Sequence, residues 1–260
     1  MLLVFFAVGQ DTIVAAQTVD HTAWDILLKQ FVKQGLVDYQ GLRAPRVQHI
    51  DYLGTLNEMP GWLLLETYLS ALTQTNLVQV TSKQEQMAFW INAYNACVFQ
   101  GVLDHYPINS VKDVKGFFDK IHYEVAGASL TLNEIEAKGR ALGDWRIHFG
   151  VVCASSSCPT LRSEAYVPER LEEQLADQTR RFLADPQRGL RVEGTTLQLS
   201  SIFKWYAGDF VPNARRLSPE TILPIIRDSI PRNVVHGDIH HRQLTKIQYL
   251  DYDWSLNAQR

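Results

Sequence analysis

The segment that decides the fold reads KQEQMAFWINAYNACVFQGVLDH and spans residues 83–105. Its large apolar side chains recur at helical spacing, at Met87, Trp90, Ile91, Tyr94, Val98 and Leu103. Ser82 and Glu85 have the spacing of a capping box, and Pro107 cannot continue a helix. Because the segment is apolar nearly all round, it predicts a long helix that is buried at the centre of the protein.

The sequence before this segment predicts further helices. Residues 21–35 have the spacing of an amphipathic helix, which Gly35 would end as a C′ glycine. Residues 47–56 and 61–72 are two more helical candidates. The first third of the chain is therefore predicted to be helical.

The sequence after the central helix predicts a mixture of strands and short helices. Residues 122–125 alternate and run into a turn, and Thr131 with Glu134 forms a second capping box. RIHFGVV, residues 146–152, reads as a buried strand.

Pro168 begins another predicted helix, and residues 190–199 read as a hairpin around Glu193-Gly194. Ser200 caps a helix, and QYLDYDWSL, residues 248–256, reads as a final strand. The predicted fold class is α+β: a single mostly helical domain with a small antiparallel or mixed sheet in the later half.

Composition excludes several functional classes. The chain has 260 residues, of which 46% are hydrophobic, and a formal net charge of −3. Basic residues are scattered, so nucleic acid is excluded as a partner. No apolar run reaches about 18 residues, so the chain is predicted not to span a membrane. The expected partner is a small molecule or peptide of unknown identity.

The N-terminal stretch predicts export. MLLVFFAV, residues 1–8, is apolar, and Val14 and Ala16 suit a signal cleavage site, although a basic n-region is missing. We interpret residues 1–16 as the remnant of a signal peptide and residues 17–260 as the domain, in the periplasm or secreted. The alternative is a buried N-terminal strand in a cytoplasmic protein.

One short segment concentrates residues that can carry chemistry. HFGVVCASSSCPTL, residues 148–161, contains two of the three cysteines and one histidine. If Pro159 begins a helical turn, Cys158 lies at a helix N-terminus, where the dipole favours a reactive thiolate. On a strand, His148 and Cys153 would face opposite sides, so a direct pair between them needs a bend.

Three interpretations of this segment remain open. The first is a nucleophilic Cys153 or Cys158 with His148 as its base, and Asp209, Asp251 or Asp253 as a third member. The second is a Cys153–Cys158 disulfide, which would pin the loop or act as a redox pair. The third is a tight loop of small residues without chemistry. Cys-x-x-Cys is absent, so the sequence holds no thioredoxin-type motif. The Cys/His spacing matches no structural zinc pattern, so no metal is predicted, and no cofactor is expected.

Polar residues in apolar surroundings extend this candidate site. Asn95 falls on the core side of the central helix, where an amide without partners would cost about 1–3 kcal/mol, so we expect it to support the cysteine loop. Asp209 and Asp253 lie among aromatic residues that could line a cleft: Trp205, Tyr206, Tyr252 and Trp254.

At these residues the sequence resembles the DUF547 domain family. The resemblance rests on FWINAYNA (89–96), LDHYP (103–107), RIHFGVVCASSSCPTL (146–161), FKWYAGDF (203–210) and YLDYDWSLN (249–257). The family is named for its unknown function, and its bacterial relatives commonly look exported. The resemblance gives weight to a site built from Asn95, His148, Cys153 and Cys158 with Asp209 or Asp253 nearby, and it makes Cys97 a buried passenger thiol.

The functional hypotheses follow from the open interpretations. The first is a cysteine-dependent hydrolase or acyl transferase that acts on a peptide or amide, with Cys153 or Cys158 as nucleophile and His148 as base. The alternatives are a non-catalytic envelope binding module, whose loop is locked by a Cys153–Cys158 disulfide, and a thiol–disulfide redox protein.

Overall fold

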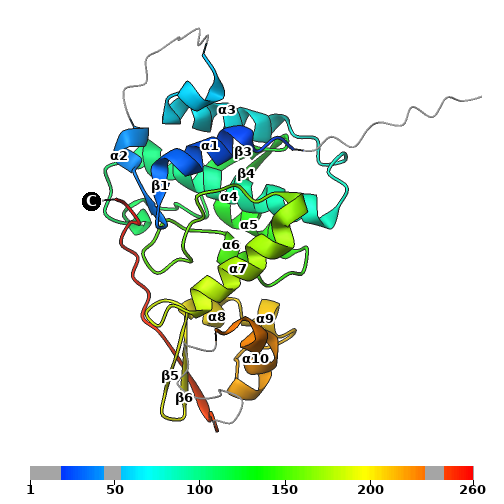
Figure 1. Ribbon diagram of the computed structural model, residues 1–260, viewed down its shortest axis with the longest axis vertical. Coiled ribbons are helices and arrows are strands. Elements are labelled where there is room, and N and C mark those ends of the chain that lie inside the picture. Colours follow the sequence, from blue (N-terminus) through cyan, green and yellow to red (C-terminus); the bar gives the residue numbers. More distant parts are fainter. Residues whose placement is uncertain (1–18, 44–53, 232–242, 260) are drawn as a thin grey trace, which may run out of the picture.

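Helix α4 (Lys83–His105) forms the centre of the protein, as its apolar sequence predicts (Figure 1). The computed structural model describes residues 19–43, 54–231 and 243–259. The backbone N–H of Glu85 donates to the Ser82 hydroxyl at 3.1 Å, which confirms the predicted cap. Residues are buried along almost the whole helix, Asn92 and Asn95 included.

Three helices surround α4 and complete the larger of two hydrophobic cores. They are α1 (Thr22–Phe31), α3 (Gly61–Gln74) and α5 (Leu132–Arg140). The predicted capping box begins α5, where the Thr131 N–H donates to the Glu134 carboxylate at 2.8 Å and the Glu134 N–H returns a bond to the Thr131 hydroxyl at 3.3 Å.

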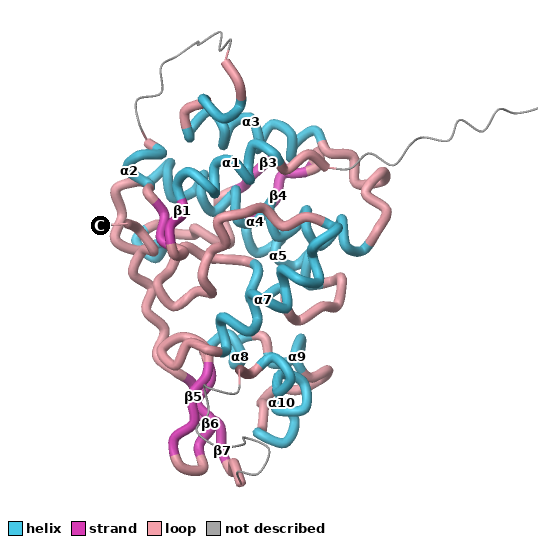
Figure 2. The backbone as a smooth tube through the Cα atoms, viewed as in Figure 1, coloured by secondary structure: helices cyan, strands magenta, loops and turns pink. Residues whose placement is uncertain are grey.

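The strands of the described residues form three small sheets (Figure 2). Two are hairpins, β1 (Val32–Lys33) with β2 (Leu36–Val37), and β3 (His122–Val125) with β4 (Ala128–Thr131). The third joins β5 (Leu190–Glu193) and β6 (Thr196–Leu199) as the predicted antiparallel hairpin, and β7 (Lys246–Tyr249) adds to β6 in parallel. The α+β class with a small mixed sheet in the later half is therefore confirmed.

The smaller hydrophobic core lies beside the three-stranded sheet, at the lower end in Figure 1. The helices around it are α7 (Leu171–Leu183), α8 (Ser201–Trp205), α9 (Ala207–Phe210) and α10 (Pro219–Ile226). Phe149 is buried at its centre against Phe182, Phe203 and Phe210. The remaining short elements are α2 (Tyr39–Leu42), α6 (Ile147–Gly150) and the 3₁₀ turns η1 (Leu56–Glu58), η2 (Val111–Asp113), η3 (Pro168–Arg170) and η4 (Arg227–Ser229).

The C-terminal segment connects the two ends of the molecule. After β7 it runs from the three-stranded sheet back to β1 and β2, where Val37 pairs with Ala258 (Figure 1). The prediction of one strand over 248–256 is wrong beyond Tyr249, because the chain changes partners along its path. Ser255 pairs with Ser110 and Leu256 pairs with Ser155 as isolated bridges.

Two further predictions of secondary structure are wrong. Helix α1 ends at Phe31 rather than Gly35, because β-branched Val32 and Val37 pair across a hairpin whose turn needs the positive φ of Gly35, +82°. The predicted strand over 146–152 is instead α6 followed by extended chain. Asp144 accepts the Arg146 N–H at 3.0 Å and starts this helical turn, which an apolar pattern of seven residues cannot distinguish from a buried strand.

Two predictions concern residues that lie wholly or mostly outside the described part of the chain. The candidate helix 47–56 lies mostly outside the described residues, which resume at residue 54, and residues 1–16 lie outside them entirely. Among the helices that are described, none combines the length and the apolarity needed to cross a bilayer.

Candidate functional site

Cys153 and Cys158 form a disulfide across the loop that follows α6, with their Cα atoms 6.3 Å apart. The C-terminal segment holds this loop. The Ser157 N–H donates to the Asp253 carbonyl at 3.1 Å, and the Asn257 N–H donates to the Ala154 carbonyl at 3.0 Å. The loop is therefore fixed at both of its sides before the disulfide adds a covalent link.

Asn95 on α4 holds the chain that enters the loop. Its amide nitrogen donates to the Gly150 carbonyl at 3.0 Å, and its amide oxygen accepts the Val152 N–H at 2.8 Å. One turn earlier, Asn92 bonds in the same two-sided way to the backbone of Tyr166. Both buried amides replace hydrogen bonds that a strand would have made, which explains why this backbone can be irregular and still buried.

We expect Asn95→Ala to lower the free energy of unfolding by about 2–3 kcal/mol, because two buried backbone groups lose their partner. Asn92→Ala is the matched control and is expected to cost a similar amount. Urea unfolding measures both. Only Asn95→Ala should also change the rate at which dithiothreitol reduces the Cys153–Cys158 bridge, and equal reduction rates in the two variants would contradict this role for Asn95.

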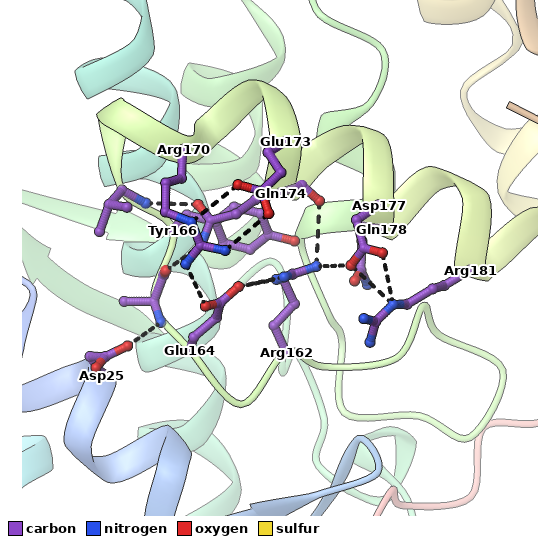
Figure 3. A network of polar contacts seen from close by, with 12 residues as sticks. Asp25, Arg162, Glu164, Tyr166, Arg170, Glu173, Gln174, Asp177, Gln178 and Arg181 are labelled. Carbon is purple, nitrogen blue, oxygen red and sulfur yellow. Dashed lines mark hydrogen bonds and ion pairs between the residues drawn. The ribbon is translucent and has the colours of Figure 1, made fainter. Parts of the chain in front are cut away.

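The segment after the loop is anchored to α7 by a network of charged side chains (Figure 3). Arg162 contacts the Glu164 carboxylate and lies 2.6 Å from the Asp177 carboxylate. Arg170 adds a bond to Glu164 at 2.9 Å. Since Arg162 and Glu164 follow Cys158 closely in the sequence, this network fixes the exit of the cysteine loop as Asn95 fixes its entrance.

The sulfur of Cys158 is surrounded by hydrogen-bond donors. It accepts the backbone N–H of Cys153 at 2.9 Å, and the hydroxyls of Tyr252 and Ser155 lie 3.2 Å and 3.4 Å away. The same two hydroxyls also lie near the Cys153 sulfur, at 3.3 Å and 3.2 Å. The backbone donor therefore distinguishes the two sulfurs and favours negative charge on Cys158.

The expected helix start at Pro159 is absent, so Cys158 does not lie at a helix N-terminus. Residues 159–167 are irregular, because their backbone groups bond to side chains such as Asn92 and Gln178 rather than to one another. The donors around Cys158 replace the helix dipole as the local cause that favours a thiolate.

His148 is 2% exposed and lies on α6, where its Nε2 is 2.8 Å from a carboxylate oxygen of Asp209. Its ring stacks on Tyr206 with the centroids 4.0 Å apart. Burial lowers the pKa of His148 to about 4, against the opposing effect of Asp209, so the ring is neutral near pH 7. The helical turn removes the strand alternation that separated His148 from Cys153, and both residues line one cavity.

Of the three carboxylates considered as partners of His148, which were Asp209, Asp251 and Asp253, the structure brings only Asp209 to it. Arg140 forms a two-pronged bond to Asp209, at 2.6 Å and 3.0 Å. Burial alone would raise the pKa of Asp209, but the bonds from Arg140 and His148 outweigh it and lower that pKa. The Asp253 carboxylate instead accepts the Ser255 N–H at 2.9 Å, and Asp253 does not line the cavity.

The cavity beside the disulfide has a volume of about 390 Å³. Both cysteines and His148 lie in its wall, together with the four aromatic residues that were expected to line a cleft. The full lining is Tyr94, Phe118, Asp119, Asn133, Glu136, His148, Val151, Cys153, Cys158, Pro159, Ile202, Trp205, Tyr206, Tyr252 and Trp254. The cavity is large enough for a small molecule or for one or two side chains of a peptide.

Glu136 on α5 belongs to this site and was missed in the sequence. It is 8% exposed, Tyr206 hydrogen-bonds to it, and its Oε1 has no hydrogen-bond partner and lies 4.0 Å from Nδ1 of His148. Burial raises its pKa. The helical spacing could have identified it, because Leu132, Ile135 and Gly139 mark the buried face of α5 and Glu136 falls on that same face.

The described residues contain no group of three or more His, Cys, Asp or Glu side chains that could hold a metal ion. Cys97 is buried and unpaired, and burial raises the pKa of its thiol. The chemistry that the described part of the site can offer therefore rests on two sulfurs, hydroxyl groups, a neutral imidazole and carboxyl groups.

Residues 78–183 match the model of a family described as "Protein of unknown function, DUF547". This range holds the central helix, both cysteines, His148, Asn95 and Glu136. Comparison with curated proteins and with solved structures gave no match.

Proposed function

We propose that the Cys153–Cys158 pair performs thiol–disulfide exchange on a thiol bound in the adjacent cavity. Both cysteines lie within residues 78–183, which match the DUF547 family, and the description of that family assigns no function. The observation that carries this proposal is the cage of donors around the Cys158 sulfur. A neutral disulfide sulfur is a weak acceptor, whereas a thiolate is a strong one. The cage therefore fits a sulfur that leaves as a thiolate.

Exposure assigns the roles of the two sulfurs. Both cysteines line the cavity, but Cys158 is only 3% exposed, whereas Cys153 is half-buried and therefore more accessible to a bound thiol. A substrate thiolate, having given its proton to solvent, attacks the Cys153 sulfur; a substrate–Cys153 bond forms, the Cys153–Cys158 bond breaks, and Cys158 departs as a thiolate that then takes up a proton.

A second thiol of the substrate completes the reaction. As a thiolate it attacks the substrate sulfur of the mixed disulfide, which releases an oxidised substrate and a Cys153 thiolate. The substrate loses two electrons and the protein disulfide gains them. A second disulfide-bearing molecule must then reoxidise the cysteine pair by the same exchange in the opposite direction.

Equilibration of the folded protein in glutathione redox buffers tests this proposal. Intact mass after alkylation is expected to show a gain of two alkyl groups at Cys153 and Cys158 while the protein stays folded. A bridge that resists reduction until the protein unfolds would contradict exchange and would instead support the alternative of a binding module with a locked loop.

A cysteine-dependent hydrolase or acyl transferase is the second candidate, and the His148–Asp209 hydrogen bond favours it. A histidine held by a carboxylate and facing a cavity with a cysteine is the arrangement that activates a thiol nucleophile. This chemistry requires the reduced protein. Iodoacetamide should then label Cys153 or Cys158 faster than it labels them in His148→Ala, and equal rates would rule this candidate out.

The same bridge supports a proposal about the compartment. Disulfides persist in oxidising compartments and are rare in the cytosol. The proposal therefore places the protein in the periplasm or outside the cell, in keeping with the apolar residues 1–16 as a signal peptide remnant.

A further inference from the structure

The cavity beside the disulfide contains acids and aromatic rings, and neither lysine nor arginine is among the described residues that line it. Glu136 lies within it, and Asp119 adds an exposed carboxylate. His148 contributes no positive charge near pH 7, because burial lowers its pKa to about 4. Arg140 and Lys112 lie against the lining residues Tyr206 and Trp254, and Arg140 is already paired with Asp209. An anionic ligand would therefore lose its hydration here without a cation of the cavity lining to pair with.

Thiol–disulfide exchange nevertheless places negative charge in this cavity, first on the attacking sulfur and then on Cys158. The donors that contact the Cys158 sulfur are an N–H group and two hydroxyls, all uncharged, whereas the guanidinium of Arg188 bonds to the Cys158 carbonyl oxygen and not to its sulfur. Hydrogen bonds from neutral donors stabilise an anion less than a nearby cation does. A substrate that carries its own positive charge would place a cation inside the cavity, where no described lining residue supplies one.

The aromatic side of the cavity, formed by Trp205, Tyr252 and Trp254, can bind such a charge. Trp205, Tyr252 and Trp254 pack against one another with ring centroids 4.7 Å to 5.8 Å apart, and Trp205 is 47% exposed. Lys112, which does not line the cavity, places its ammonium 4.1 Å from the Trp254 ring centroid. This wall thus already accepts a cation on one of its rings.

We infer that the substrate is a cationic thiol, with an ammonium or guanidinium group a few bonds from its sulfur. The cation lies against Trp205 and is attracted by Asp119, while the sulfur reaches Cys153. This inference rests on the proposed exchange reaction and adds the charge of its substrate. A free aminothiol and a peptide cysteine beside a lysine both satisfy it.

Three small thiols of similar size test the inference: cysteamine, 2-mercaptoethanol and 3-mercaptopropionate, which are cationic, neutral and anionic. The rate of bridge reduction is followed by quenched alkylation and intact mass, and is expressed per thiolate. Each rate is divided by the rate on the oxidised peptide VCASSSCP, residues 152–159, which removes the intrinsic reactivity of each thiol. A Lys-Cys dipeptide with its C-terminus amidated tests the peptide source.

The normalised rate is expected to be highest for the cationic thiols, by about threefold to tenfold over 2-mercaptoethanol, and lowest for 3-mercaptopropionate. Trp205→Leu and Asp119→Asn should each reduce this preference. Asp251→Asn removes the same charge at an exposed position outside the cavity lining and should leave the preference unchanged.

The outcomes separate the two proposals. If no thiol reduces the protein faster than the peptide, the proposed exchange function fails. If all thiols reduce the protein faster than the peptide but equally, or if the anionic thiol is fastest, the exchange function stands and the cationic substrate is overturned.

Discussion

Replacement of Cys158 by alanine is expected to trap a thiol substrate on Cys153 as a mixed disulfide. When substrate is offered as its disulfide to the Cys158→Ala protein, the Cys153 thiolate attacks it and a mixed disulfide forms. In the native protein, Cys158 lies in position to attack this intermediate and release the substrate. We expect the trapped species to last at least about a hundredfold longer in the variant, because an intramolecular thiol acts at millimolar or higher effective concentration.

Two controls make this prediction specific. Cys153→Ala loses the same bridge, at a similar cost of about 2 kcal/mol for so short a loop, and it retains Cys158 as a thiol. Because Cys158 is buried, Cys153→Ala should form the mixed disulfide far more slowly. Cys97→Ala should behave like the native protein, since Cys97 is buried and takes no part in the bridge. Intact mass and peptide mapping read the result, and trapping on Cys158 instead of Cys153 would reverse the assigned roles.

Acidification from pH 6.5 to pH 4 is expected to destabilise the protein strongly. Burial lowers the pKa of both His21 and His148 to about 4. Between these values and the ordinary histidine value of about 6.5, the unfolded chain binds two protons that the folded chain refuses. The free energy of unfolding therefore falls as pH falls through this window, by on the order of 2–3 kcal/mol for each histidine.

The carboxyl groups change the shape of this profile. Burial raises the pKa of Glu136, so its folded form keeps a proton that the unfolded form loses above about pH 4.5, and it opposes the histidines. Asp209, whose pKa is lowered, contributes stability that is lost only on further acidification.

Urea unfolding at several values between pH 4.5 and pH 7 measures the profile. His21→Gln and His148→Gln should each remove about half of its slope, since each removes one of the two protons. A profile that is flat across this range, or that rises toward pH 4.5, would contradict the neutral, buried state of both rings.

The larger part of the fold could be predicted from the sequence where local signals agree with tertiary structure. The N-cap at Ser82 and the capping box at Thr131 begin helices where they were expected, and the hairpin turns at Gly194, next to Glu193, as its sequence predicts. The errors occur where tertiary bonds replace local ones. No local pattern could show that Asn95 would satisfy Gly150 and Val152, which frees residues 146–152 from being a strand.

The candidate site was also predicted only where its residues are close together in the sequence. Its sulfurs and His148 lie within eleven residues of one another, so a short segment could identify them. Asp209 was one of three possible carboxylates, and only the packing of α9 against α6 brings it to His148. Glu136 was overlooked although it falls on the apolar face of α5, where a charged residue points to a functional or paired carboxyl.

The most direct test of the central claim is the rate at which the native, folded protein oxidises a reduced peptide that contains two cysteines. The expected result is formation of the peptide disulfide, with one protein bridge reduced for each bridge formed, and no oxidation by the Cys153→Ala variant. A native protein whose Cys153–Cys158 bridge stays intact while the peptide stays reduced would contradict the claim that this pair exchanges.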